Sequence, residues 1–381
     1  MYLVGVDVGG THTKFGLIEN DKIIKSIVVE TNAFDVLRQV SNGIRELVQN
    51  SGKYLDQITG VAVGFPGMVV GSMVKDSPNI GIKECNVEKI LSEELGCPVI
   101  VKNDAELATL AEHKMGAGDN CNSMVLLTFG TGIGGGIIAN GKLYDGVGGA
   151  GEFGHVSFER NGKRCTCGRI GCAEQYLSMA ALEKLAREII AGHNDTIITE
   201  TSQGRINASE LVRAYKKNDA CAVAIITKYV AMLTEYILDI CNMFRPEKIV
   251  IGGGITYATE IIDMVAKKCK EQNFGFANSP RVDIVPAKLG NNAGMLGAVA
   301  CYENFKQDEI IKPLSQYDVN LEEDEIEETA DTNAEIEKIS QSVDLLNQFV
   351  QASKASSDDD EIVYDDSLLA RVNEMLKKKN R

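Results

Sequence analysis

Residues 5–23 read GVDVGGTHTKFGLIENDKI, and residues 127–143 read LTFGTGIGGGIIANGKL. Each stretch leads from an apolar, strand-like segment through a glycine turn that carries a threonine and into a second strand-like segment. The two stretches look like copies of one hairpin, which indicates that the two halves of the chain share an architecture.

Helical patterns alternate with further strand-like segments on both sides of these hairpins. Apolar residues three and four apart predict amphipathic helices over residues 34–49, 87–95, 179–191, 220–243 and 256–272. Strand-like segments at 58–67, 98–104 and 248–255 lie between them and end in glycine or polar turns. This alternation predicts an α/β fold.

The length of 381 residues exceeds what one hydrophobic core usually serves, and 44% hydrophobic residues suffice for two cores. We therefore predict an N-terminal α/β domain over 1–118 and a C-terminal α/β domain over 119–305. As an alternative, the last helix of the second domain packs back on the first domain.

An acidic extension over 313–381 is predicted to follow these domains. The net charge is −15, and 18 acidic against 7 basic residues fall between Asp318 and Arg381. Such charge density favours a solvated, partly disordered tail. Two short amphipathic helices, over 336–350 and 368–376, keep docking or partner binding open as the alternative.

The chain is predicted to be cytoplasmic, without a membrane or nucleic-acid partner. No stretch approaches 18 apolar residues, and the N-terminus enters a strand without a basic flank or cleavage site. The acidity argues against binding a phosphate backbone. In a reducing compartment the ten cysteines point to metal binding or core filling rather than to disulfides.

The glycine turns are candidate phosphate sites. In each, glycines let backbone N–H groups approach an oxyanion closely, with hydroxyls from Thr11 and Thr131 and charge from Lys14. A third turn, at 252–254, would present backbone to a nucleotide at a helix N-terminus. The alternatives are tight hairpin turns for the first two and an unliganded strand-to-helix turn for the third.

The order of these motifs resembles the ROK family of sugar kinases, above all its bacterial glucokinases, over about residues 1–305. The motifs are DxGGT (7–11), PG (66–67), ND (103–104), GTGxGGG (130–136), ExGH (152–155), CxCGxxGCxE (165–174), GGG (252–254) and GNxAGxxGA (290–298). Single glycine motifs are weak signals, whereas the cysteine cluster after ExGH is highly specific.

The resemblance implies a two-domain ribonuclease-H-like fold of the actin and hexokinase ATPase type, with ATP and sugar between the domains. It assigns the nucleotide and Mg²⁺ side to Asp7, Gly9, Gly10, Thr11, Lys14, Thr131, Gly132, Gly134, Gly253 and Gly254. Asp7 would lie near Mg²⁺, and the last two glycines would face the adenosine. The sugar would be bound by Gly67, Asn103, Glu152, His155 and Glu174.

Asp104 is the candidate catalytic base. A sugar hydroxyl is a poor nucleophile at neutral pH, and a carboxylate within hydrogen-bond reach accepts its proton as it attacks the γ-phosphoryl group. Asn103 would orient the sugar through its amide. Taken without its neighbours, an Asn-Asp pair after a strand is more often a turn or a helix N-cap, but the resemblance favours catalysis.

His155, Cys165, Cys167 and Cys172 form a candidate structural zinc site. Three thiolates and one imidazole are the ligand set of a closed tetrahedral site, which leaves no position for an activated water. The zinc would shape the loop that carries Glu152, His155 and Glu174. The alternatives are a redox pair, for which Cys-x-Cys is a cramped geometry, and unrelated buried thiols.

These observations predict an ATP- and Mg²⁺-dependent glucokinase that makes glucose 6-phosphate for glycolysis. Relatives that phosphorylate N-acetylmannosamine, N-acetylglucosamine, fructose or allose share every motif, so the sugar stays open, as does a donor such as polyphosphate. A sugar-responsive transcriptional regulator is the alternative outside enzymes. Such proteins carry a helix-turn-helix ahead of the first strand, and with six residues before Asp7 we do not expect one here. The resemblance implies a homodimer or homotetramer.

Overall fold

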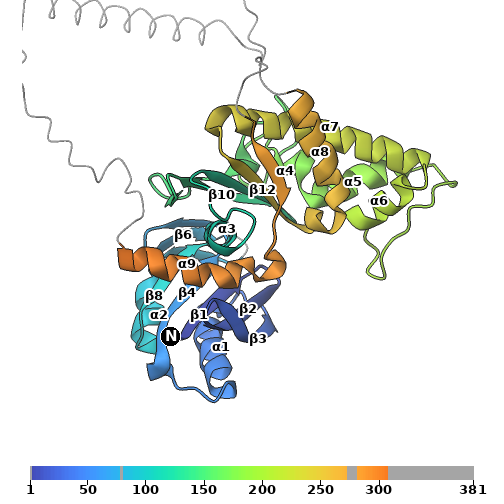
Figure 1. The fold of residues 1–381 in the computed structure, drawn as a ribbon. Helices are drawn as coiled ribbons and strands as arrows, with labels where there is room; N and C mark the ends of the chain where they lie inside the picture. Colours follow the sequence, from blue (N-terminus) through green and yellow to red (C-terminus); the bar gives the residue numbers. More distant parts are fainter. Residues whose placement is uncertain (1, 78–79, 273–280, 308–381) are drawn as a thin grey trace, which may run out of the picture. The chain divides into compact units, whose positions relative to one another are not determined.

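The structure, a computed structural model, describes residues 2–77, 80–272 and 281–307, with side chains described as far as Tyr302. Two five-stranded sheets organise this part of the chain (Figure 1). The predicted tail over 313–381, with its two amphipathic helices, lies outside the described residues, and the domain boundary near residue 118 stays a prediction.

The two sheets have the same strand order and the same strand directions. The first is ordered β3 (Lys22–Glu30), β2 (His12–Glu19), β1 (Tyr2–Val8), β4 (Ile58–Phe65) and β8 (Val99–Asn103). The second is ordered β11 (Lys142–Tyr144), β10 (Ile133–Ala139), β9 (Met124–Phe129), β12 (Lys248–Gly253) and β13 (Asp283–Pro286). In both, three antiparallel strands are followed by two parallel ones. The predicted duplication is confirmed.

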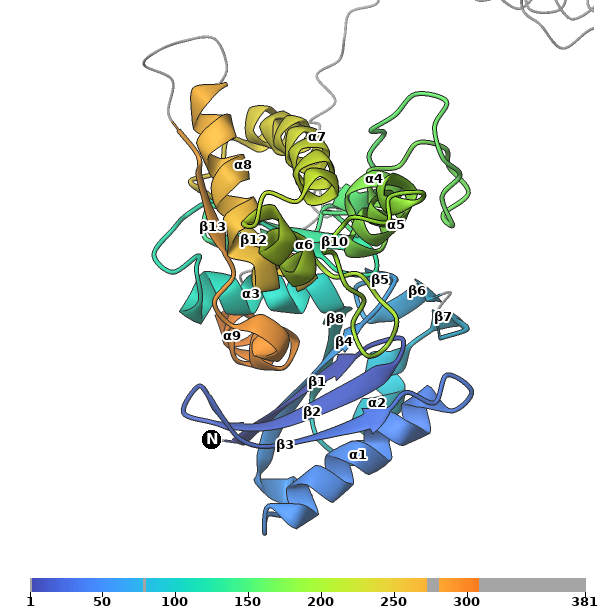
Figure 2. The same cartoon turned by 90° about the vertical axis from the view of Figure 1, so that its right-hand side faces the viewer.

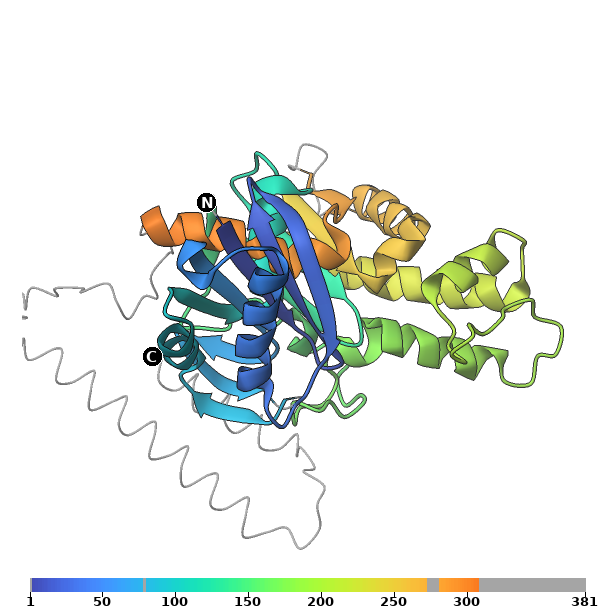
Figure 3. The same cartoon turned by 90° about the horizontal axis from the view of Figure 1, so that it is seen from below.

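Helices cover both faces of the first sheet. The outer face packs against α1 (Val36–Asn50) and α2 (Val87–Leu95), and Figure 3 shows α1 lying across the strands. The inner face packs against α3 (Asp104–Met115) and α9 (Ala293–Gln307). Beside the sheet lies a small antiparallel one of β5 (Met68–Val70), β6 (Met73–Ser77) and β7 (Ile82–Cys85).

Strand alternation explains how β1 serves both faces. Val4, Val6 and Val8 point to the outer core, whereas Leu3 belongs to the inner one. Gly5 also faces inward, and a Cβ there would lie 1.9 Å from the carbonyl oxygen of Met295. The glycine therefore allows α9 to cross the sheet at close range, and Asp7, two residues on, faces the same side.

The second sheet shares α3 and α9 with the first. Leu126 and Val250 join Leu107 and Val299 in one buried cluster between the sheets. On the far face pack α4 (Glu174–Leu177), α5 (Met179–Ile190), α6 (Ala208–Tyr215), α7 (Ala220–Phe244) and α8 (Thr259–Glu271), as Figure 2 shows. The two sheets therefore approach each other at α3 and α9.

Helix α7 is long and apolar enough to span a membrane by length and composition, with a mean hydropathy of 1.5 over its most apolar window. Its buried side chains, among them Ile225, Tyr229 and Leu233, belong to the core of the second sheet. A mostly buried core helix meets the same criteria, and the contacts of α7 are those of a core helix.

Short 3₁₀ turns complete the described fold: η1 (Leu55–Gln57), η2 (Phe153–His155), η3 (Gly254–Ala258) and η4 (Gly290–Asn292). The helix predicted over 256–272 begins instead at Thr259, because η3 intervenes after β12. Gly253 has a φ of 81° and turns the chain into η3. The third glycine turn therefore opens a 3₁₀ turn, not an α-helix as predicted.

Candidate active site

A cavity of about 690 Å³ between the two sheets gathers most of the predicted site residues. Its walls include Asp7, Lys14, Gly67, Asn103, Asp104, Thr131, Gly132, Gly134, Glu152, His155, Cys167, Glu174 and Gly253. Six predicted residues do not line it: Gly9, Gly10, Thr11, Cys165, Cys172 and Gly254. Segments separated by more than 200 residues therefore form one site.

Asn103 ends β8 and caps α3. Its Oδ1 accepts hydrogen bonds from the backbone N–H groups of Ala105 (2.8 Å) and Glu106 (3.3 Å), and Glu106 accepts one from the N–H of Asn103 (3.2 Å). Its Nδ2 donates to the carbonyl of Gly67 at 2.9 Å. The N-cap alternative is thus correct for Asn103. An amide carries two donor hydrogens, so one is left for a ligand in the cavity.

Asp104 is the first residue of α3, and its carboxylate accepts a hydrogen bond from the N–H of Ala105 at 2.9 Å. Burial raises the pKa of Asp104 to about 7, and the negative charges of Asp7 and Glu152 add to the effect. A carboxylate with a pKa near neutrality is suited to take a proton from a hydroxyl and to release it afterwards.

Asp7 and Lys14 are paired across the first hairpin. They are opposite residues in the β1–β2 register, and Lys14 Nζ lies 3.0 Å from Asp7 Oδ2. A Cβ at Gly294 of α9 would lie 2.9 Å from Asp7 Cγ, so only a glycine leaves this carboxylate room. The pair places one negative and one positive group on the cavity wall.

The two glycine turns differ in their surroundings. In the first, the N–H of Gly9 donates to the carbonyl of His12 (3.0 Å), and Thr31 Oγ1 donates to the carbonyl of Gly9 (2.7 Å). In the second, Glu174 Oε2 accepts the N–H of Ile133 at 3.0 Å. Glu174 therefore supports the turn of Thr131 and Gly132 while it lines the cavity.

An exposed tyrosine that sequence reasoning missed stands beside the third glycine turn. Tyr257 lies in η3, lines the cavity and is 70% exposed; its hydroxyl accepts a hydrogen bond from Asn291 Nδ2 at 3.4 Å. An exposed aromatic ring at such an edge offers a stacking surface for a purine. An aromatic residue three positions after the glycines was the only signal for it in the sequence.

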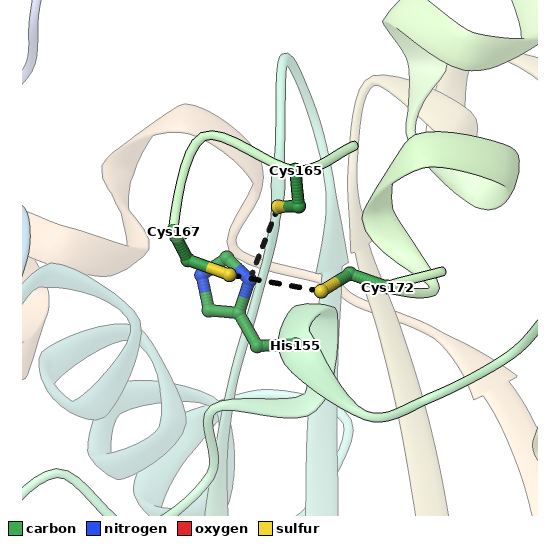
Figure 4. A group of neighbouring side chains, drawn as sticks. All are labelled: His155, Cys165, Cys167 and Cys172. Carbon is green, nitrogen blue, oxygen red and sulfur yellow. Dashed lines mark hydrogen bonds between the residues drawn. The ribbon is translucent and has the colours of Figure 1, made fainter. Parts of the chain in front are cut away.

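The predicted metal ligands converge (Figure 4). The ligand atoms of His155, Cys165, Cys167 and Cys172 all lie within 4.8 Å of one another. His155 Nδ1 is 3.6 Å from the Cys165 sulfur, and the Cys167 and Cys172 sulfurs are 3.7 Å apart. Ligand bonds of about 2.0–2.3 Å in a tetrahedron give edges close to these values. The cluster thus fits Zn²⁺.

The thiols of the cluster differ in protonation: burial and the neighbouring thiols raise the pKa of Cys172 to about 12, whereas the pKa of Cys165 is lowered. Burial raises the pKa of Cys165, but hydrogen bonds from the backbone and thiol of Cys167 outweigh it and leave the pKa at about 7. Thiolates are the ligand form, so this cysteine is prepared for a cation. Gln175 Nε2 also donates to the Cys165 sulfur at 3.7 Å.

His155 joins the cysteine cluster to the cavity. Its Nδ1 faces the thiols, whereas its Nε2 lies 4.0 Å from Glu152 Oε2. Burial raises the pKa of Glu152, His155 opposes the shift and Glu174 adds to it. A metal on Nδ1 would hold the imidazole with Nε2 toward the cavity.

Glu112 is a further residue that sequence reasoning missed. It is buried on α3 and accepts the backbone N–H groups of Ala117, Lys288 and Leu289 at 2.7–3.1 Å. It thereby anchors the segment before η4, whose residues Gly290 and Asn291 line the cavity. Lys288 and Leu289 are 176 and 177 residues from Glu112, so no local pattern reveals these two contacts.

Comparisons with known proteins identify the family and agree with the fold. The sequence profile of the ROK family matches residues 3–304. A glucokinase from Halalkalibacterium halodurans is 33% identical over 78% of this chain and 93% of its own length. An N-acetylmannosamine kinase from Haemophilus influenzae is 26% identical over 78% and 94%. A Streptomyces griseus ROK glucokinase, solved with glucose and AMPPNP, is 28% identical with a TM-score of 0.69, covering 78% of this chain and 98% of its own.

Proposed function

The chain belongs to the ROK family and has the actin- and hexokinase-type ATPase fold of its sugar kinases, and from this premise we propose that it is a glucokinase. As a sugar kinase it would transfer the γ-phosphoryl group of ATP to the 6-hydroxyl of glucose. The observation that carries the proposal is Asp104, fixed at the start of α3 in the cavity with a pKa of about 7.

Asp104 would accept the proton of the 6-hydroxyl as the oxygen attacks. Nδ2 of Asn103 would donate to a neighbouring sugar hydroxyl, and Glu152 and Glu174 would accept from others. His155 Nε2, held toward the cavity, would complete the set. The carbonyl of Gly67 orients Asn103 through its hydrogen bond, which gives this glycine a positioning role.

The nucleotide would occupy the other end of the cavity. Lys14, Thr131, Gly132 and Gly134 would contact its phosphates, Gly253 and Gly254 its adenosine. Gly9, Gly10 and Thr11 would reach a phosphate from the exposed first turn. When bound, Mg²⁺ would neutralise charge on the transferring phosphoryl group, and Asp7 is the carboxylate that would hold it through water.

The zinc would be structural, bound by His155, Cys165, Cys167 and Cys172. Their donor set and spacing leave no open coordination position, so the metal would shape the sugar loop instead of activating water. We further propose a cytoplasmic enzyme of carbohydrate metabolism, without a nucleic-acid or membrane partner, that forms a homodimer or homotetramer.

A kinase for N-acetylmannosamine is the second candidate, because a relative with that name matches nearly as much of the chain. A coupled ADP-release assay with ATP and Mg²⁺ on glucose, mannose, fructose, allose, N-acetylglucosamine and N-acetylmannosamine separates the two. Preference for glucose supports the proposal. Turnover confined to an N-acetylated sugar contradicts the substrate, and no turnover with any sugar favours a sugar-sensing regulator.

A further inference from the structure

A buried lysine precedes the catalytic pair. Lys102 lies on β8 and faces inward, as Ile100 does, so its side chain is only 9% exposed. Its Nζ lies 3.1 Å from Asp145 Oδ2, and the Asp145 side chain is 14% exposed. The two residues come from different sheets: β8 belongs to the first, and Asp145 directly follows β11 of the second.

Glu106 is the third member of this buried charge cluster. It is 3% exposed, and its carboxylate accepts the backbone N–H of Asn103. Burial lowers the pKa of Lys102, but the charges of Glu106 and Asp145 outweigh it and raise the pKa above its usual value. The lysine therefore stays charged beside both carboxylates. Asp145 Oδ1 is buried without a hydrogen-bond partner among the described residues, so Lys102 is the cation that compensates this carboxylate.

Asp145 also begins a glycine-rich strap, residues 145–151, that leads to Glu152. Its carbonyl accepts the N–H groups of Gly148 (2.8 Å) and Ala150 (3.3 Å). A Cβ at Gly148 would lie 2.7 Å from the side chain of Val70 in β5, and one at Gly151 would lie 3.0 Å from the carbonyl of Gly135 in β10. The strap is therefore packed between the first and second halves of the molecule.

The glycines make the strap dependent on its anchor. Gly146, Gly148, Gly149 and Gly151 all have positive φ values, and glycine loses the most conformational freedom on ordering. A segment of this composition holds one conformation only where its surroundings specify it. The ion pair at its first residue is its charged anchor. Val147 at the tip of the strap is 74% exposed.

We propose that Lys102 and Asp145 are positioning residues for the sugar, a role that rests on the proposed kinase function. Lys102 joins two segments that reach opposite ends of the proposed sugar site. One contains Glu106, which holds Asn103, and the other is the strap, which leads to Glu152. The pair sets the distance between Asn103-Asp104 and Glu152. The nucleotide contacts expected from Lys14, Thr131 and Gly253 lie on other segments, so the pair acts on sugar affinity and not on ATP affinity.

The test compares Asp145→Asn, Lys102→Met and the double variant, with Lys102→Arg as the conservative change. We expect Asp145→Asn to raise the sugar KM about tenfold while the ATP KM stays within about twofold. Lys102→Met should have a larger effect, because it leaves two buried carboxylates without a cation. The double variant should be no worse than Lys102→Met alone, since both disrupt one unit. Lys102→Arg keeps the charge and should therefore retain most of the wild-type sugar affinity.

Lys75→Met is the matched control, because Lys75 pairs with Glu84 at 3.0 Å on the surface of the small sheet. Its sugar KM should equal that of the wild type. If Lys102→Met does not fold, the isosteric Asp145→Asn decides. A sugar KM within about twofold of wild type in Asp145→Asn, even with a lower Tm, would show a merely structural pair and overturn the proposal.

Hydrogen exchange separates failure of this proposal from failure of the proposed function. Exchange of the peptide covering 144–156 is measured without substrates, so it does not require turnover. Faster exchange in Asp145→Asn than in wild type supports the anchoring of the strap even if no sugar is phosphorylated. Unchanged exchange contradicts it, whatever the enzyme activity.

Discussion

Replacing Asp104 by Asn is expected to lower turnover severely while it stabilises the protein. The amide keeps the oxygen that accepts the N–H of Ala105, so the start of α3 is preserved. It cannot accept the proton of a hydroxyl, and loss of a general base typically lowers kcat by about 10²–10⁴-fold. Sugar and ATP affinities should change little, because Asn103, Glu152 and Glu174 remain.

The stability gain follows from the pKa of Asp104, which is raised from 3.8 to about 7. Between these values the folded carboxyl keeps its proton and the unfolded one loses it, so ionisation progressively destabilises the fold as pH rises. The cost is absent below about pH 4 and complete above about pH 7. The full shift corresponds to about 4 kcal/mol, and water in the cavity reduces it, so we expect about 2 kcal/mol.

The assay is thermal and urea unfolding of wild type and variant, without ligands, at pH 4.5 and pH 8. We expect the variant to have a higher Tm by about 4 °C at pH 8 and a nearly equal Tm at pH 4.5. Asp219→Asn is the matched control, and its effect on stability at pH 8 should have the opposite sign. Hydrogen bonds from the backbone of Ala222 and Ile197 outweigh burial and lower the pKa of Asp219, so the variant should be less stable at pH 8.

Two results would refute the reasoning separately. Wild-type kcat in Asp104→Asn would exclude Asp104 as the base. An equal Tm difference at pH 4.5 and pH 8 would show that the carboxyl is not held protonated by the fold, even if turnover is lost.

Three further predictions follow from the same structure. Wild-type kcat/KM should fall about tenfold per pH unit below about pH 7, because Asp104 must be ionised to accept a proton; a profile flat down to pH 5 would contradict this. Cys167→Ser should lower the bound zinc, measured by mass spectrometry, and raise the sugar KM. Cys85→Ser, outside the cluster, should leave the zinc content and the sugar KM unchanged. Unchanged zinc in Cys167→Ser would contradict the ligand set. Gly253→Ala should destabilise the protein by about 1–3 kcal/mol in urea unfolding and raise the ATP KM. The φ of Gly253 is 81°, and the new Cβ would lie 2.4 Å from the carbonyl of Phe129. The control Gly52→Ala, with φ 67° and no atom near the added Cβ, should show only the smaller backbone cost.

The sequence was most informative where chemistry is local. The three cysteines and the histidine fall within 18 residues, and the structure brings their ligand atoms together. The paired hairpins predicted two related sheets, because strand, turn and strand are each visible in a short window. Asn103 and Asp104 were singled out by the family resemblance, and the capping role of Asn103 was established by the structure.

Residues that act through distant partners were not recognised. Lys102 and Asp145 are 43 positions apart, and Glu112 is about 176 positions from the backbone that it anchors. Neither spacing corresponds to a helix or strand period, so each residue looks like an ordinary surface charge in the sequence. The same limit misplaced the start of α8, where the 3₁₀ turn η3 takes the place of the expected first helical turn.

By itself, the sequence determined the α/β class and the duplicated hairpins and predicted the cluster of three cysteines and one histidine, because residue type and short spacing encode them. The choice of Asp104 as the proposed base came from the family resemblance. Only the tertiary structure decided the properties that depend on surroundings. The pKa of Asp104 results from burial and from the charges of Asp7 and Glu152, which lie 97 residues before it and 48 after it. The cavity likewise exists only where α3 and α9 bring the two sheets together, because electrostatics and packing depend on distance in space and not along the chain.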